Sequence, residues 1–209
     1  MLMQANSGSG KQGARTFTEA ARRAQIVNAA IEVIAEHGLP NTSFAKIAQQ
    51  AGLSSTGMIS YHFRGKDDLI REVTAEIVRV NTEFVVAKLE PEAGYHARLR
   101  AYFAASLALL DEYPHHQRAL ASIVANVRPD DKQAFGLLEH VADIARGQEE
   151  WIREAQRAGA FRDFDPAVMA LAIRAARDAA VARAADDPDF DAAACARELA
   201  ELFERATRA

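Results

Sequence analysis

The stretch from Gly52 to Leu69, GLSSTGMISYHFRGKDDL, decides the fold. It follows SFAKIAQQAG (residues 43–52), whose apolar residues have helical spacing and whose Ser43 is a suitable N-cap. The hydroxyl cluster after Gly52 offers caps for a second short helix that runs through Phe63, and Arg64-Gly65 ends it. Two short helices joined by a tight, glycine-containing turn are typical of a helix-turn-helix. The sequence therefore predicts this motif over residues 43–63.

The second helix of such a motif places the side chains near its amino terminus in the major groove of DNA. Ser54, Ser55 and Thr56 stand at that position, where hydroxyls and free backbone N–H groups suit a phosphate as well as a cap. A Tyr-His-Phe run is more often core packing, and we expect Phe63 to be core under either interpretation. Function therefore depends on whether the residues around Phe63 remain exposed.

The rest of the chain reads as helical throughout, which makes the fold class all-α. Helix-breaking residues fall at the seams between the periodic segments, at Pro114, Pro129, Gly159, Pro166 and Pro188. No segment shows the alternation of a strand. The predicted helices cover about 19–37, 43–52, 54–63, 66–89, 94–112, 115–128, 131–158, 166–185 and 191–207.

Charge is distributed unevenly along the chain. Residues 1–66 hold seven basic and three acidic residues, a balance of +4, whereas the remainder holds 18 basic and 26 acidic residues, a balance of -8. Such a split suggests that the first third meets a polyanion. A non-specific architectural DNA-binding protein, the first alternative, would be basic throughout, and the acidic remainder argues against it.

Composition excludes several other classes. The longest uncharged run, AYFAASLALL at residues 101–110, is about half the roughly 20 residues of a membrane span, and no signal-peptide core is visible. The single Cys195 fits a reducing, cytoplasmic location. His115-His116 and Glu139-His140 lack further ligands at metal-binding intervals, so we expect no metal, no cofactor and no helical enzyme, the second alternative.

The segment TSFAKIAQQAGLSSTGMISYHFRGKDDL, residues 42–69, resembles the DNA-binding segment of the TetR family of bacterial regulators. The shared features are Ile47-Ala48, Ala51-Gly52-Leu53-Ser54, the aromatic run before Arg64, and a lysine followed by two acids and a leucine. The resemblance implies an N-terminal three-helix helix-turn-helix DNA-binding domain and a C-terminal helical ligand-binding and dimerisation domain. On that basis we divide the chain into a disordered tail (1–17), a DNA-binding domain (18–66) and an effector-binding and dimerisation domain (67–209).

The resemblance also implies partners: double-stranded operator DNA, a small-molecule effector and a second copy of the chain, with repression the commoner output. Two departures from the family's pattern are an extra residue between Gly52 and Gly57, and Ser60 where a tyrosine is common. Carried over by position, Ser43 and Lys66 should contact phosphates. The residues expected in or beside the groove are Ser54, Ser55, Thr56, Met58, Ser60, Tyr61 and His62.

The last two helices are the candidates for dimerisation, because their alanine-rich faces allow close approach. The residues expected at the interface, from helical spacing, are Met169, Ile173, Ala176, Ala180, Leu199, Leu202 and Phe203. The alternative is that these stripes pack within their own subunit.

The helices between head and interface are the candidate sensor, in which a pocket should be mainly apolar with a few polar groups. The candidate effector residues are Phe103, Leu107, Asn126, His140, Ile144, Gln148, Trp151, Arg174 and Arg177. Each is more often a core or surface residue than a ligand contact. The helix from Lys66 to Leu89 should couple sensor to DNA, since it spans both.

Overall fold

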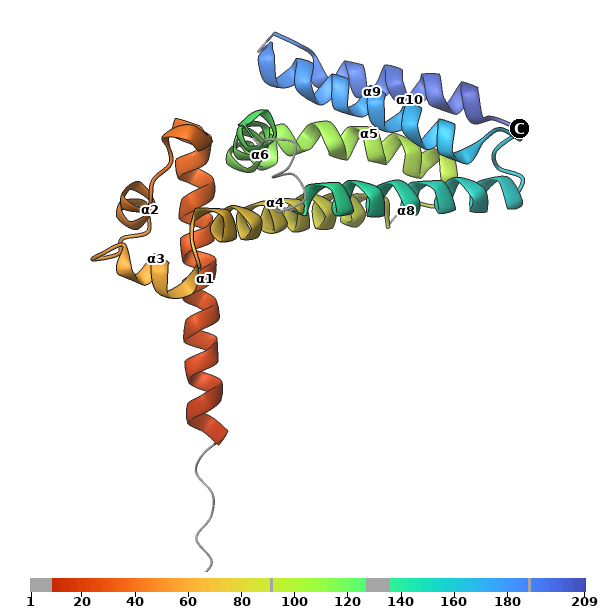
Figure 1. Ribbon diagram of the computed structural model, residues 1–209. Helices are drawn as coiled ribbons and strands as arrows, with labels where there is room; N and C mark the ends of the chain where they lie inside the picture. Colours follow the sequence, from red (N-terminus) through yellow and green to blue (C-terminus); the bar gives the residue numbers. More distant parts are fainter. Residues whose placement is uncertain (1–8, 91, 127–135, 188) are drawn as a thin grey trace, which may run out of the picture.

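The computed structural model describes residues 9–90, 92–126, 136–187 and 189–209, and within them the chain is helical with no strand. The predicted motif consists of α2 (Phe44–Gln50) and α3 (Gly57–His62). It is preceded by α1 (Ser9–His37) and a 3-10 turn, η1 (Leu39–Asn41), and followed by α4 (Lys66–Leu89); α1 to α3 with the start of α4 form the head. The body contains α5 (Tyr95–Glu112), α6 (Pro114–Asn126), α8 (Leu137–Arg157), α9 (Pro166–Asp186) and α10 (Ala192–Thr207). Figure 1 shows α2 and α3 on one side of α1, while α4 runs away from this head into the body. The predicted all-α class is confirmed.

Local sequence signals account for most helix ends. Gly38 (φ 78°) and Gly52 (φ 63°) adopt the left-handed backbone that ends α1 and forms the turn after α2. The Ser43 hydroxyl accepts the Lys46 N–H at 3.3 Å and so caps α2, as predicted. Asp165 and Asp191 cap α9 and α10 in the same way.

Three boundaries differ from the sequence prediction. Helix α1 begins at Ser9, so residues 9–17 are helical rather than part of the expected tail, and residues 1–8 lie outside the described residues. That segment lacks an apolar period, which is the signal from which the other helices are predicted. The helix predicted over 131–158 is described from Leu137 onward. Helix α3 begins at Gly57, and Thr56 at its N-cap makes no side-chain capping bond.

The molecule has two hydrophobic cores. The head core joins α1, α2 and α3 to Leu69, Ile70, Val73 and Ile77 of α4 and to Ala119 and Ile123 of α6. The body core joins α5, α8, α9 and α10. Packing of the head therefore continues past residue 66, the predicted domain boundary, and α4 takes part in it before passing along α5. None of the described helices combines the length and apolarity that a bilayer span requires.

Candidate nucleic-acid interface and effector body

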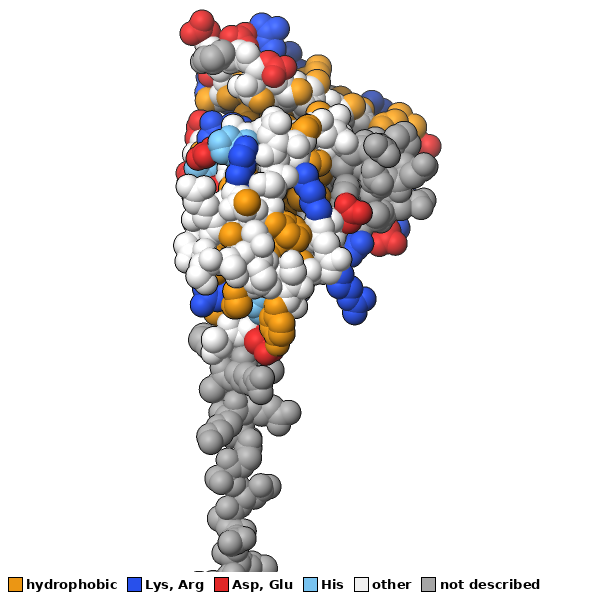
Figure 2. All heavy atoms as spheres, turned by 60° about the vertical axis from the view of Figure 1, so that its left-hand side comes forward, with side chains coloured by type: hydrophobic (Ala, Val, Ile, Leu, Met, Phe, Trp, Pro, Cys, Tyr) orange, Lys and Arg blue, Asp and Glu red, His pale blue; other side chains and the backbone are white. Residues whose placement is uncertain are grey.

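One side of helix α3 is buried in the head core, and the other side is exposed to solvent. Ile59 is fully buried and Phe63 is 2% exposed, so both hold α3 against α1. Tyr61 on the opposite side is 70% exposed. The other predicted groove residues Ser54, Ser55, Thr56, Met58 and Ser60 are exposed as well, and His62 is half-buried against the Tyr61 ring. Figure 2 turns this side forward and shows mostly uncharged polar side chains and backbone, with isolated Lys and Arg side chains.

Arg23 of α1 fixes the end of α3, a role that the sequence did not reveal. Its Nη1 donates to the His62 carbonyl oxygen at 2.7 Å, its Nη2 lies 2.9 Å from Glu72 Oε1, and its guanidinium carbon sits 4.5 Å from the centre of the Phe63 ring. A cation at the last carbonyls of a helix is favoured by the helix dipole. Arg23 therefore joins α1, α3 and α4. The signal available in the sequence was one more arginine in a basic segment.

Lys46 and Lys66 of the head also bind backbone carbonyls. Lys66 Nζ, the predicted phosphate contact, donates to the carbonyl oxygens of Leu39 and Thr42 at 3.0 Å each, and Lys46 Nζ donates to Asn41 at 3.0 Å. An ammonium group has three N–H donors, so Lys66 retains one beyond this pair. Lys66 is exposed, as is Ser43, the other predicted phosphate contact. The ammonium groups of these lysines thus also stabilise the fold of the head.

The predicted effector residues divide among several environments. Phe103 is fully buried and stacks on Phe203, and Leu107 is buried beside a groove between α5 and α10. Asn126 is exposed and donates to the Ser122 carbonyl of its own helix, so it contributes to no described hollow. Trp151 belongs to an aromatic cluster with Tyr95 and Phe161.

His140 lines a hollow of about 560 Å³ between α4 and the start of α8. Thr74, 2% exposed, also lines it, and its hydroxyl oxygen has no hydrogen-bond partner. Burial lowers the pKa of His140, and the Asp143 carboxylate opposes that shift. Ile144 and Gln148, one and two turns further along α8, are half-buried.

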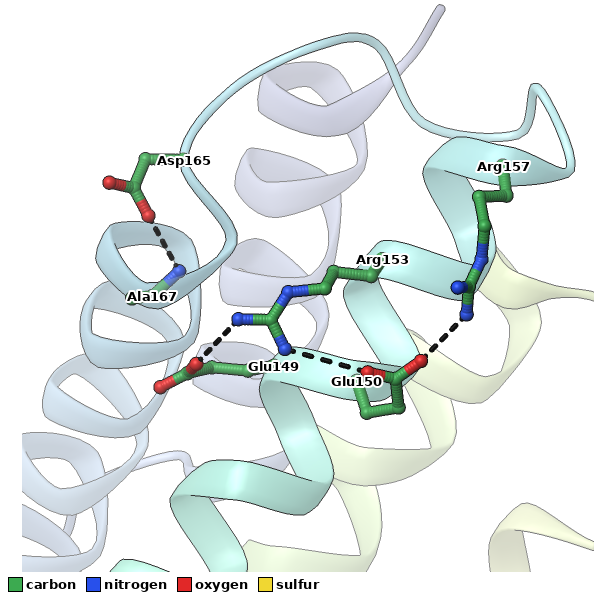
Figure 3. A network of polar contacts seen from close by, with 6 residues as sticks. All are labelled: Glu149, Glu150, Arg153, Arg157, Asp165 and Ala167. Carbon is green, nitrogen blue, oxygen red and sulfur yellow. Dashed lines mark hydrogen bonds and ion pairs between the residues drawn. The ribbon is translucent and has the colours of Figure 1, made fainter.

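The outer face of α8 carries a ladder of ion pairs (Figure 3). Arg153 lies 2.9 Å from Glu149 and 3.5 Å from Glu150, and Arg157 lies 2.6 Å from Glu150. The Arg157 hydrogen bond lowers the pKa of the Glu150 carboxyl. Each of these exposed pairs contributes little to stability, but together they define which side of α8 faces solvent.

The structure corrects part of the predicted dimer interface. Ile173, Ala180 and Phe203 are buried in the core of their own subunit, so they cannot form a contact surface. Met169, Ala176 and Leu199 are half-buried, whereas Leu202 is 58% exposed. Because α9 carries apolar residues on both faces, spacing alone could not separate its inner stripe from the outer one.

The structure thus combines a helix-turn-helix head, whose second helix has an exposed side, with an all-helical body. Residues 26–73 match the family of bacterial regulatory proteins of the tetR type. This match covers the head of the molecule, from α1 into α4, and makes that part of the chain similar to the DNA-binding region of the family.

Curated relatives match in the same region. The HTH-type transcriptional regulator BetI of Burkholderia cenocepacia is 37% identical over 90 residues, which is 41% of this chain and 44% of the relative. BetI of Paraburkholderia phymatum gives the same identity over 41% and 43%. The match thus spans less than half the length of these relatives.

Solved structures resemble the whole fold at low identity. FadR of Bacillus subtilis, solved with stearoyl-CoA, has a TM-score of 0.75 at 22% identity, over 86% of this chain and 96% of that one. A protein from Saccharomonospora viridis solved with choline has 0.78 at 21%, over 91% and 99%. AibR, solved with isovaleryl coenzyme A and operator DNA, has 0.67 at 18%, over 87% and 97%. These likenesses establish the fold.

Proposed function

We propose that this protein is a homodimeric transcriptional repressor that binds operator DNA through α3 and leaves it when a small-molecule effector binds the body. The observation that carries the proposal is the orientation of α3. Ile59 and Phe63 are buried in the head core, while Tyr61, Met58 and the hydroxyl cluster (Ser54, Ser55 and Thr56) are exposed to solvent. A short helix held this way can present side chains and N–H groups to a major groove. The location is expected to be cytoplasmic, where such DNA is found.

Dimerisation would use the outer face of α9 and α10. These helices lie side by side at one edge of the body (Figure 1). Val168 is 62%, Leu171 59% and Leu202 58% exposed, which is unusual for large apolar side chains without a partner. A second copy would cover them and would place two heads on half-sites about 34 Å apart.

The effector would act through α4. The hollow lined by Thr74 and His140 lies directly against this helix, and the same helix packs into the head core through Leu69 and Val73. A ligand that prefers one orientation of α4 shifts the population of DNA-competent dimers. An affinity difference of about 3 kcal/mol between the two states would change operator affinity by roughly 150-fold.

Genomic fragment selection tests the proposal. The full chain would be mixed with sheared DNA from the source organism at low salt, and retained fragments would be sequenced and footprinted. We expect a few sites with two half-sites one helical turn or a multiple apart. Tyr61→Ala should lose most of this enrichment, while Arg183→Ala on the far end of α9 should keep it. Retention of no duplex would refute DNA binding, and equal retention of all fragments would favour the architectural alternative.

A further inference from the structure

Two arginines of α9 face the interior of the body. Ala170, Ile173 and Ala180 form the buried stripe of α9, and Arg177 falls on the same stripe by helical spacing, with Arg174 one turn before it. The exposed residues Val168 and Leu171 lie on the opposite side. Both arginines are half-buried. A cation in this position is costly unless an anion or several acceptors compensate it.

Among the described residues, Arg174 has no partner and Arg177 has only the carboxylate of its neighbour Asp178. Arg174 Nη1 is buried without a hydrogen-bond partner, and no ion pair involves this residue. Arg177 Nε is also buried without a hydrogen-bond partner; it lies 3.0 Å from Asp178 Oδ1, but that contact is poorly directed and the Asp178 side chain is 64% exposed. By contrast, Arg153 and Arg157 on the outer face of α8 each have a carboxylate partner (Figure 3).

Neighbouring helices bring further polar groups to this interior. Gln148 of α8 donates through Nε2 to the Tyr102 hydroxyl of α5 at 3.0 Å, and its Oε1 is buried without a partner. Gln148 lies one turn before Ile152, which is fully buried in the body core, and α8 packs against α9. Three helices thus supply unsatisfied or partly satisfied polar groups inside an otherwise apolar core.

We propose that Arg174 and Arg177 of α9, with Gln148 of the adjoining α8, bind an oxyanion carried by the effector, which is therefore an amphiphilic carboxylate or phosphate ester. This inference rests on the proposed regulatory function and names the chemistry of its ligand. Oxyanions accept charge-assisted hydrogen bonds from guanidinium groups, often two at once. The apolar part would lie against the surrounding core side chains, of which Trp151 is the largest.

The placement disfavours two other partners for the arginines. A second copy of the chain would cover the Val168 and Leu171 side of α9, whereas Arg177 lies on the buried stripe, away from the carboxylates of such a copy. A quaternary ammonium ligand, such as the choline bound in the Saccharomonospora viridis protein, would meet two like charges here. The charge of the ligand is therefore the property to test.

The test compares matched probes on the full-length protein. Octanoate and octyl phosphate represent the two oxyanion sources, 1-octanol is the uncharged control and octyltrimethylammonium the cationic control. Occupancy would be read from the fluorescence of Trp151, the single tryptophan, and from calorimetry. We expect at least one anion to bind, and Arg174→Gln to weaken it at least about tenfold. Arg174→Lys should restore part of the affinity, and Arg183→Gln, an exposed arginine of the same helix, should have no effect.

A second variant keeps the test decisive if Arg174→Gln fails to fold. Gln148→Glu supplies an internal carboxylate of the same shape, so it should raise the melting temperature of the ligand-free protein and abolish anion binding. Equal binding of all four probes, unchanged anion affinity in Arg174→Gln, or a lower melting temperature in Gln148→Glu would overturn the inference. A protein that binds its operator but ignores both anions overturns only this inference. Arginine-dependent anion binding without any duplex binding overturns the proposed function instead.

Discussion

Replacement of Arg23 by methionine tests whether the head is held together by its own cations. Methionine keeps much of the aliphatic length but removes the donors to the His62 carbonyl and the Glu72 carboxylate and the charge over the Phe63 ring. If Arg23 instead contacts DNA, as its place in a basic segment allows, the same change would remove a phosphate contact. The two roles predict different salt dependence.

The expected loss of stability can be estimated from the three contacts. A charge-assisted hydrogen bond to a helix-terminal carbonyl contributes about 1.5 kcal/mol, the half-exposed ion pair about 0.5 kcal/mol and the cation–π contact about 0.5–1 kcal/mol. The free energy of unfolding should therefore fall by about 2.5 to 3 kcal/mol, since each contact joins separate helices. DNA affinity should fall as well, because the end of α3 loses its anchor.

Urea unfolding followed by circular dichroism measures the stability, and fluorescence anisotropy with a selected operator measures affinity between 50 and 200 mM salt. A positioning role predicts lower affinity with an unchanged slope of log K against log salt. Arg22→Met, at the preceding residue, is the matched control, because Arg22 bonds Gln25 on its own helix. Unchanged stability together with a slope reduced by about 0.9 would refute the reasoning and make Arg23 a phosphate contact.

Three further changes test other parts of the structure. Lys66→Ala should weaken binding to every duplex, reduce the salt slope by about 0.9 and destabilise the head by about 1 kcal/mol; a change confined to sequence preference would contradict the phosphate assignment. Leu202→Glu should yield folded monomers in analytical ultracentrifugation with poor operator affinity, whereas Phe203→Glu should unfold the body because it buries a charge. A dimer that survives Leu202→Glu would exclude the α9–α10 interface. Burial, assisted by the neighbouring His115, lowers the pKa of His116 below 6.5, and burial also lowers the pKa values of His96 and His140. The unfolded chain then binds more protons below about pH 6.5, so urea midpoints should fall from pH 7.5 to 5.5, and fall less in His116→Gln; a steeper fall in that variant would reverse the assignment.

The fold could be predicted from the sequence where local signals and apolar period agree. Gly38, Gly52, Ser43 and the prolines at helix starts mark ends that depend on a few neighbouring residues. The start of α1 could not be predicted, because a polar helix that extends from the head has no apolar period. The side of α9 that packs into the core could not be predicted either, because its sequence has an apolar stripe on each side.

The sequence indicated which residues around α3 are exposed, but it did not indicate which contacts the basic residues of the head make. The residues around α3 were predicted from motif spacing, and the structure places Tyr61 and Met58 on its outer side. Arg23, Lys46 and Lys66 look equivalent in a charge count, yet Arg23 and Lys66 bind carbonyls 39 and 27 residues away, whereas Lys46 binds one only five residues away. The unpaired state of Arg174 likewise depends on which helices surround it.

These internal bonds limit how an effector could release DNA. It could reshape the head or reorient it as a unit. Arg23 ties α1 to α3 and α4, Lys66 ties α4 to the turn before α2, and the Leu39 N–H donates to Ser122 of α6 at 2.9 Å. Reshaping would break several of these bonds at once, including charge-assisted ones, whereas reorientation leaves them intact. Since α4 and α6 both join the head core, a shift of these two helices against α5 carries the whole head with it. Rotation of intact heads is therefore the less costly route by which a dimer could lose its half-site spacing.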